Sequence, residues 1–235
     1  MFNSFEELKR YVEKNNVKTL DFKIPELKGS WKHLSVPAQR LKPEIFEEGF
    51  GFDGSNYGYA NVEKSDMVFK PDYRTAFEDP FWEEKTLAFL GRIYEVGKGG
   101  DIPFNGESRN VLLRSLEYMR ENDHADQFIL GPEFEYYIFD EVYYWNQNHN
   151  TGFNVYSQQA AWDRDNYDGF KVNPKRGYHV DAPHDRDKDL RAAISTALED
   201  LGIEVKYHHH EVGGPGQHEI ETERVPAEKM ADDTM

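Results

Sequence analysis

The sequence predicts an α+β protein, because segments with helical spacing and segments with strand-like alternation are mixed along the chain. The clearest helix is 187–202, with Gly202 as its cap, and the clearest buried strand is KTLAFLGRIYE (85–95). Two alternating segments, 17–24 and 30–38, flank a turn and predict a hairpin. The apolar face expected for the helix comprises Leu190, Ala193, Ile194, Ala197, Leu198 and Leu201.

Three further helices are expected from capping and spacing. Ser4 and Glu7 form a capping box in front of a helix that ends at Asn15–Asn16. The stretch KPEIFEEG (42–49) predicts a short helix with proline in its first turn. Ser108 is expected to cap a third helix. The buried face of that helix would comprise Val111, Leu112, Ser115, Leu116 and Met119.

The segments between the expected helices and strands predict loops and a domain boundary. Residues 49–72 are rich in glycine and aromatic residues, which predicts an ordered loop with something to contact, although Asp53-Gly54 also fits a plain tight turn. The mixture of glycine, proline and polar residues in 97–108 predicts a domain boundary. Residues 145–177 have no clean period and are expected to form a long excursion, to which we assign no role.

Two stretches place glutamates in pairs. Within an expected strand over 127–144, Glu133 and Glu135 are two residues apart, so both carboxylates would point to one face. In HHHEVGGPGQHE (208–219), Glu211 and Glu219 flank a glycine- and proline-rich turn, and a hairpin there would bring them together.

Carboxylates held this close repel one another and are costly to bury unless a cation lies between them. Oxygen ligands favour Mg²⁺ or Mn²⁺ over zinc. Two plainer readings remain open: paired glutamates are commonly the solvated face of a sheet, and a histidine run resembles a purification tag, although this one is internal. A third alternative is a small metal-dependent β-barrel enzyme that uses His208, His210 and His218 as ligands.

Composition narrows the class of protein. Lys plus Arg number 28 against 44 for Asp plus Glu, a net charge of −16, which argues against nucleic acid or an anionic membrane as partner. The chain has no cysteine, so disulfides and thiolate metal sites are excluded. No apolar run approaches the roughly 20 residues of a membrane span and no secretory leader is visible, so we expect a cytoplasmic protein.

Five motifs in order resemble the glutamine synthetase family along the whole chain. They are DGSN (53–56), EKSDMVFKPD (63–72), GPEFEYY (131–137), GYH (177–179) and HHHEVGGPGQHE (208–219). The resemblance implies an N-terminal β-grasp-like domain, 1–104, followed by the first part of a catalytic domain, 105–235, built on a curved antiparallel sheet flanked by helices.

The resemblance also implies roles for individual residues. Glu135, Glu211 and Glu219 would hold one divalent ion, Mg²⁺ or Mn²⁺, and Glu133 would hold the second with ligands from further along the chain. Asp53 would belong to the loop that takes up ammonium. The family assembles as stacked rings, so a homo-oligomer with active sites between subunits is expected.

Several positions depart from the family. Lys206 stands where bacterial members usually carry a glutamate on the nucleotide side, and Asn56 stands where a second serine is common. Thr222, Glu223 and Arg224 lie where the family lines its nucleotide pocket, but the match is loose. Family chains run on for about as long again, and that second half supplies a metal-binding histidine, arginines for glutamate and phosphate, and a flap glutamate.

The resulting interpretation is the N-terminal part of a glutamine synthetase, which uses ATP to join ammonia to glutamate through an acyl phosphate. The 235-residue chain alone is expected to be inactive. The alternatives are a ligase of the same family that joins glutamate to another amine, such as a polyamine, and a truncated relative without turnover. The sequence does not fix the amine, the regulation, or whether the chain is a natural product or a fragment.

Overall fold

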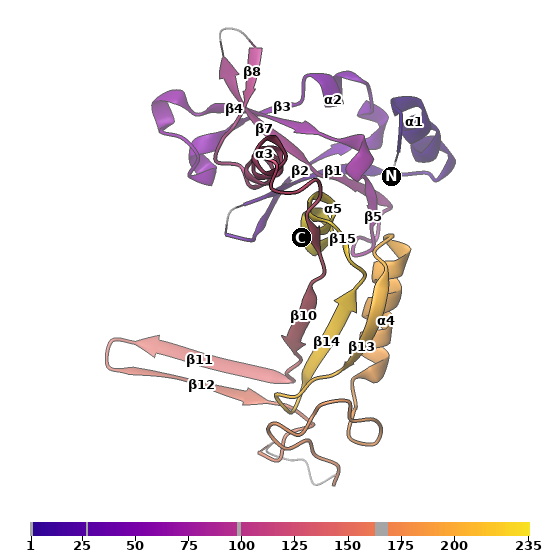
Figure 1. The fold of residues 1–235 in the computed structure, drawn as a ribbon, viewed down its shortest axis with the longest axis vertical. Helices are drawn as coiled ribbons and strands as arrows, with labels where there is room; N and C mark the ends of the chain where they lie inside the picture. Colours follow the sequence, from indigo (N-terminus) through magenta and orange to yellow (C-terminus); the bar gives the residue numbers. More distant parts are fainter. Residues whose placement is uncertain (1, 27, 98–99, 163–168) are drawn as a thin grey trace. The chain divides into compact units, whose positions relative to one another are not determined.

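The structure is a computed structural model, and it describes residues 2–26, 28–97, 100–162 and 169–235. The chain divides into two compact units (Figure 1). The first comprises Met1–Ile129 together with Pro226–Met235, and the second comprises Leu130–Val225. Helices and antiparallel strands occur in both units, which confirms the predicted α+β class. The domain boundary at 104–105 stays a prediction, because these units describe packing alone.

The first unit contains two four-stranded sheets. One has the order β2-β1-β6-β5, in which β1 pairs antiparallel with β2 and parallel with β6. The other has the order β3-β4-β7-β8 and is antiparallel throughout. The strands are β1 (Thr19–Pro25), β2 (Trp31–Pro37), β3 (Phe50–Asp53), β4 (Asp66–Pro71), β5 (Phe77–Asp79), β6 (Thr86–Phe89), β7 (Gly91–Gly97) and β8 (Gly100–Pro103).

Aromatic side chains form the centre of this unit. Phe22, Phe69 and Phe89 are fully buried, and the rings of Phe22 and Phe89 stack with their centroids 5.4 Å apart. Leu8 and Val12 lie four residues apart on the buried face of the first helix and pack in this core. The helices of the unit are α1 (Phe5–Lys14), α2 (Glu44–Glu47), α3 (Ser108–Glu121) and α5 (Ala227–Thr234). Four short 3₁₀ helices are η1 (Ala38–Arg40), η2 (Gly54–Tyr57), η3 (Val62–Lys64) and η4 (Tyr73–Thr75).

The second unit is built on an antiparallel sheet of three strands in the order β10-β14-β13, with α4 packed against β13 and β14. These elements are β10 (Glu133–Tyr137), α4 (Lys188–Asp200), β13 (Val205–His210) and β14 (Gln217–Thr222). A separate hairpin pairs β11 (Glu141–Gln147) with β12 (Asn150–Tyr156) and extends as a two-stranded ribbon (Figure 1). Two-residue strands, β9 (Ile129–Leu130) and β15 (Val225–Pro226), lie where the chain passes between the units.

Two predicted strands are wrong as single elements. The segment 85–95 divides at Leu90 into β6 and β7, which belong to different sheets, because the Leu90 backbone bonds to Thr75 and Asp72 instead of a neighbouring strand. The segment 127–144 divides into β9, β10 and β11. Its breaks fall at Gly131-Pro132, where proline lacks a donor for the ladder, and at Ile138–Asp140.

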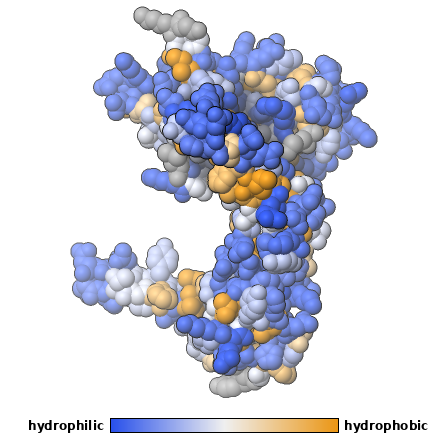
Figure 2. Space-filling view, viewed as in Figure 1, coloured by the Kyte–Doolittle hydropathy of each residue, from blue (hydrophilic) through white to orange (hydrophobic). Residues whose placement is uncertain are grey.

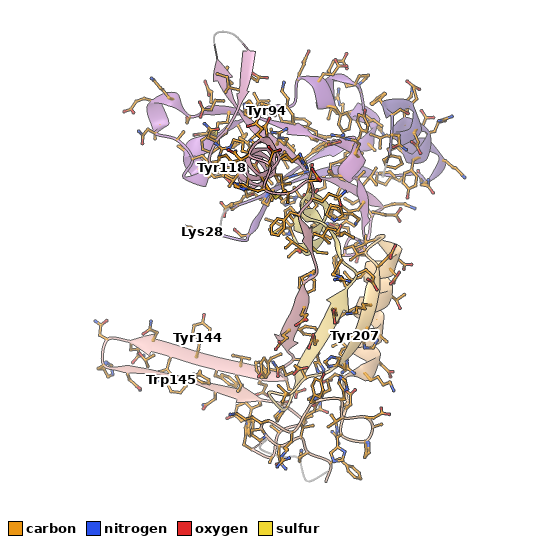
Figure 3. The ribbon with its side chains drawn as sticks, in the orientation of Figure 1. Lys28, Tyr94, Tyr118, Tyr144, Trp145 and Tyr207 are labelled. Carbon is orange, nitrogen blue, oxygen red and sulfur yellow. The ribbon has the colours of Figure 1, made fainter. Side chains whose placement is uncertain are left out.

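Residues 145–156 are also not an irregular excursion, since they complete the β11–β12 hairpin. In this hairpin the Trp145 ring packs over Gly152, where any Cβ would collide with it. Tyr144 is 83% exposed and projects from the ribbon, as Figure 3 shows. The alternating polar and aromatic residues of this segment were the signal for a strand, and the high asparagine content concealed it.

The helix predictions need smaller corrections. Ser108 is the first residue of α3, and its cap is Glu107, whose carboxylate accepts hydrogen bonds from the amides of Arg109 and Asn110. Of the face expected to be buried in α3, only Leu116 is buried, and Val111 is 40% exposed. In α4 the buried residues are Arg191 and Ser195, whereas Leu190 is 47% exposed. In the view of Figure 2 the surface of each unit is mostly hydrophilic. Among the described residues, no helix has the length and apolar composition needed to cross a bilayer.

Candidate metal centre

The register of the three-stranded sheet gathers acidic side chains on one face. Glu135 of β10 lies opposite Glu219 of β14, which in turn lies opposite His209 of β13. The next row along the sheet joins Glu133 to Glu221. Residues directly opposite in an antiparallel ladder share a face. We call this the carboxylate face; it carries Glu133, Glu135, His209, Glu211, Glu219 and Glu221.

The turn between β13 and β14 adds Glu211 to this face. The Glu211 amide donates to the Gln217 carbonyl at 2.9 Å, so the hairpin continues past the end of β13. Gly216 has a φ of +74°, and a Cβ there would meet the Ile138 carbonyl oxygen, so the tight turn requires glycine. The predicted hairpin is therefore confirmed, and it brings Glu211 and Glu219 together as the sequence suggested.

Ligand atoms on the carboxylate face cluster in two groups. Group A comprises His209, Glu211 and Glu219, and group B comprises Glu133, Glu219 and Glu221. Within each group the side chains offer one atom each, and these atoms lie within 4.8 Å of one another. Glu219 belongs to both groups. Among the described residues Glu135 joins neither group, although it lies on the same face.

Group A is buried and its electrostatics are unfavourable without a cation. Glu211 and Glu219 are 6% and 8% exposed, and the Glu211 Oε2 atom accepts no hydrogen bond. Burial, together with the nearby Glu211 carboxylate, raises the pKa of Glu219 to about 6. His209 partly offsets this effect, with its Nε2 atom 3.6 Å from Glu219 and its Nδ1 atom 3.4 Å from Glu211.

Glu135 is held by a different partner. Its Oε2 atom accepts a hydrogen bond of 2.8 Å from the Gln217 side-chain NH₂ group, and the Gln217 side-chain oxygen accepts one from the Gly213 backbone amide. The turn that orients Glu211 therefore also orients Glu135. Of the four predicted metal ligands, Glu133, Glu211 and Glu219 belong to groups A and B. The fourth, Glu135, is hydrogen-bonded to Gln217, the residue that follows the connecting turn.

Lys206 approaches group B. Its Nζ atom lies 2.5 Å from Glu221 Oε1, and this hydrogen bond lowers the pKa of the Glu221 carboxyl. A register irregularity between Val205 and Tyr207 places both Lys206 and Tyr207 beside Glu221, with the ammonium 4.9 Å from the centroid of the Tyr207 ring. Figure 3 shows Tyr207 on this strand.

The opposite face of the sheet is anchored to α4 by a buried polar network. Arg191 pairs with Asp185 through contacts of 2.5 and 2.9 Å, and its Nη1 atom lies 2.8 Å from His218 Nδ1. His210 is fully buried and bonds to Gln159 at 2.7 Å. Burial lowers the pKa of His210 and favours its neutral form. This network fixes the plane of β13 and β14, and with it the carboxylate face.

The alternative ligand set of histidines does not converge. His210 and His218 point to the α4 face and already have protein partners, whereas His208 lies opposite Ile220. None of these three belongs to a group of potential ligands among the described residues. Instead His209, the histidine that this alternative passed over, faces the carboxylates.

The remaining predicted site residues lie elsewhere. Asp53 is the last residue of β3, in the first unit, where it is exposed and accepts hydrogen bonds from the hydroxyl and amide of Ser55 at 2.7 and 2.9 Å. These bonds lower the pKa of Asp53. Thr222 ends β14, buried and with an unpartnered hydroxyl, and Glu223 and Arg224 follow it in exposed positions.

Sequence reasoning missed two members of the face, His209 and Glu221. The alternation Glu219-Ile220-Glu221 has the same period as the pair in β10 and could have identified Glu221. His209 could have been assigned by counting two residues back from Glu211, since that spacing selects one face of a strand.

The residues of group A fit a hard divalent cation. Carboxylate oxygens dominate the donor set, and His209 adds one nitrogen. The observation that favours a cation is the buried Glu211 Oε2 atom, which accepts no hydrogen bond, because a buried carboxylate oxygen without a hydrogen bond is unfavourable.

Two family models match the chain. The model described as "Glutamine synthetase, beta-Grasp domain" matches residues 16–96, and "Glutamine synthetase, catalytic domain" matches residues 105–235. The chain is 36% identical over 218 residues to the glutamine synthetase of Aquifex aeolicus, covering 92% of this chain and 46% of that protein. It is 37% identical over 229 residues to the 3-hydroxylaminophenol mutase of Cupriavidus pinatubonensis, covering 94% of this chain and 48% of that protein.

Among solved structures, glutamine synthetase from Plasmodium falciparum superposes with a TM-score of 0.84 at 28% identity, over 98% of this chain and 46% of that one. The chain thus spans about half the length of the relatives it matches. The N-terminal domain is of the β-grasp type, as the resemblance implied. With the catalytic-domain model covering more than half of its residues, the chain belongs to the glutamine synthetase family.

Proposed function

We propose that this chain contributes the β-grasp domain and the first part of the catalytic domain to a glutamine synthetase, which ligates ammonia to glutamate at the expense of ATP. The observation that carries the proposal is the buried carboxylate face, on which Glu211 has an oxygen with no hydrogen-bond partner. A protein that only bound a macromolecular partner through this sheet would have no need to bury carboxylates against one another.

Group A, with Glu135 beside it, would hold one Mg²⁺ or Mn²⁺ ion, and Glu133 would contribute to a second one with ligands from elsewhere. When bound, these cations supply charge neutralisation, which lets an anionic nucleotide approach an anionic amino acid. The contribution of the chain is to keep the ligands in place before substrates arrive. The Gln217 amide orients Glu135, and the network around Arg191 holds the sheet that carries Glu219.

In the proposed reaction the side-chain carboxylate of glutamate takes the terminal phosphoryl group of ATP, and ammonia then displaces phosphate from the acyl phosphate. Asp53 is suited to attract ammonium and accept its proton, because the Ser55 hydrogen bonds keep it ionised. Lys206, Thr222, Glu223 and Arg224 are proposed to border the nucleotide. A cytoplasmic location and a ring-shaped homo-oligomer with sites shared between subunits complete the proposal.

A second candidate function has a specific observation in its favour. The mutase of Cupriavidus pinatubonensis matches this chain as well as the glutamine synthetases do, so sequence similarity alone does not separate the two activities. A ligase for a bulkier amine is a further candidate, which would differ at the loop around Asp53. A relative that retains metal binding without turnover is the third.

The test uses two preparations: the 235-residue chain, with its intact mass verified, and the product of the uninterrupted reading frame that contains it. Each is supplied with ATP, glutamate, Mg²⁺ and hydroxylamine, and γ-glutamyl hydroxamate is measured. We expect product from the second preparation if its frame supplies the remaining ligands. We expect none from the 235-residue chain, because the resemblance assigns the arginines for glutamate and phosphate and a further metal-binding histidine to the other half of the family's length.

Parallel reactions with ammonium, a polyamine and 3-hydroxylaminophenol separate the candidates. Phosphate release that requires ammonium supports the synthetase, and release only with the polyamine supports the amine ligase. Conversion of 3-hydroxylaminophenol without ATP supports the mutase. Synthetase turnover by the 235-residue chain itself, abolished by Glu211→Ala, would refute our expectation that it is inactive alone.

A further inference from the structure

The two groups on the carboxylate face differ in the cations already beside them. Group A has only His209, whose charge depends on protonation, and its Glu211 Oε2 atom is buried without a hydrogen-bond partner. Group B has the ammonium of Lys206 in direct contact with Glu221. The two groups share Glu219, so the occupancy of one affects the other.

An irregularity in β13 determines the position of the Lys206 side chain. Because the register slips between Val205 and Tyr207, β13 has one more residue here than β14 opposite it. The slip brings the Lys206 side chain to the carboxylate face, where its Nζ atom reaches Glu221 Oε1 at 2.5 Å and rests 4.9 Å from the centroid of the Tyr207 ring. The Glu221 side chain is 13% exposed, whereas the Lys206 side chain is 43% exposed, so water reaches the ion pair from the lysine side.

We infer that Lys206 is the resident counter-cation of group B and that it sets how many divalent ions this chain binds. Group A then takes one divalent ion with the higher affinity. A second ion at group B must displace the ammonium from Glu221 or share that carboxylate with it, and both are unfavourable because like charges repel. An ion pair with one partner 43% exposed is weak enough to open, so Lys206 competes with the second ion without excluding it.

This inference rests on the proposed metal centre and goes beyond it, because it assigns to one lysine the control of metal stoichiometry. Under this inference Lys206 acts on the carboxylates of group B, which differs from the nucleotide contact proposed above. A lysine that only touched nucleotide would leave metal binding in the absence of nucleotide unchanged.

The experiment is a titration of the 235-residue chain with Mn²⁺ at pH 7.5 without nucleotide, with free Mn²⁺ measured by electron paramagnetic resonance and heats by calorimetry. Lys206→Met removes the charge and retains most of the stem. The matched control is Lys188→Met, which removes a lysine of the same unit that pairs with Asp181 at 3.3 Å. Circular dichroism verifies that each variant is folded.

We expect the unaltered chain to bind one Mn²⁺ ion tightly and a second at least tenfold more weakly. Lys206→Met should lower the second dissociation constant at least tenfold, while Lys188→Met should change it by less than about twofold, since it alters only the net charge. Adding Glu221→Gln to Lys206→Met should abolish the gain, which locates the second ion at group B.

Two results would overturn the inference and are distinguishable from each other. If the first ion binds but Lys206→Met leaves the second dissociation constant within twofold, Lys206 does not control group B, and the metal centre itself stands. If no folded variant binds even one Mn²⁺ ion, the inference fails together with the proposed metal centre.

Discussion

Replacing Glu219 by glutamine is expected to stabilise the metal-free chain at neutral pH. The folded pKa of Glu219 is raised from 4.5 to about 6, so folding favours its neutral form. The stability that this preference contributes is fully present below pH 4.5 and is lost as pH rises through about 6. At neutral pH the folded chain therefore holds an unfavourable carboxylate, which an amide of the same shape would relieve.

The magnitude follows from the pKa. A rise from 4.5 to about 6 corresponds to about 2 kcal/mol of preference for the neutral form. We halve this to about 1 kcal/mol, because Glu133 on the same face is exposed and water therefore screens this part of the sheet. The glutamine amide can also donate to Glu211 Oε2, which has the ion-pair contact with His209 but accepts no hydrogen bond.

The assay is urea unfolding followed by circular dichroism at pH 5.0 and pH 7.5, in the presence of a chelator. The variant should exceed the unaltered chain in free energy of unfolding by about 0.5 kcal/mol more at pH 7.5 than at pH 5.0, because part of the preference for the neutral form is already lost at pH 5.0. Glu223→Gln, at an exposed position just after the same strand, is the control and should show no such difference. With added Mn²⁺ the unaltered chain should be more stable than the variant at pH 7.5, because only the unaltered chain gains binding energy. An equal effect of Glu219→Gln at both pH values would refute the electrostatic reasoning.

Two further predictions concern the supports of the site. Asp185→Ala should destabilise the second unit by about 3–5 kcal/mol, because it leaves the buried Arg191 guanidinium without its carboxylate; urea unfolding checks this against Asp181→Ala, an exposed control expected to change little. For the whole enzyme, mixing Asp53→Ala subunits with Glu135→Ala subunits should restore part of the hydroxamate activity if sites are shared between subunits. No recovery in verified mixed rings would contradict that arrangement.

Local chemistry made much of the fold predictable. The cap of α1 at Ser4, the β1–β2 hairpin and the end of α4 at Gly202 follow from short-range patterns, and the structure confirms them. The prediction failed where the chain changes sheets. At Leu90 an apolar run continues without interruption, but its backbone bonds to Thr75, which is distant in sequence, and no local pattern contains that information.

The parts of the candidate site that depend on the alternation of side chains along a strand were predictable from the sequence. Glu133 and Glu135 share a face because they are two residues apart, and the glycines between Glu211 and Glu219 predict the turn that joins them. Which of these carboxylates would meet could not be predicted, because that depends on the register between strands. The hydrogen bond from Gln217 to Glu135 also depends on this register.

The bulge in β13 has a consequence for how this site can vary in evolution. A one-residue slip in a strand ordinarily turns every later side chain to the other face. The extra residue lies between Val205 and Tyr207, where the pairing with β14 shifts. His209 and the residues after it therefore keep the same face of the sheet whether or not the residue before Tyr207 changes. Position 206 can therefore exchange one charge for another, or lose a residue, while Glu211 and Glu219 keep their alignment. Sequence variation at this position can tune cation occupancy without rebuilding the ligands.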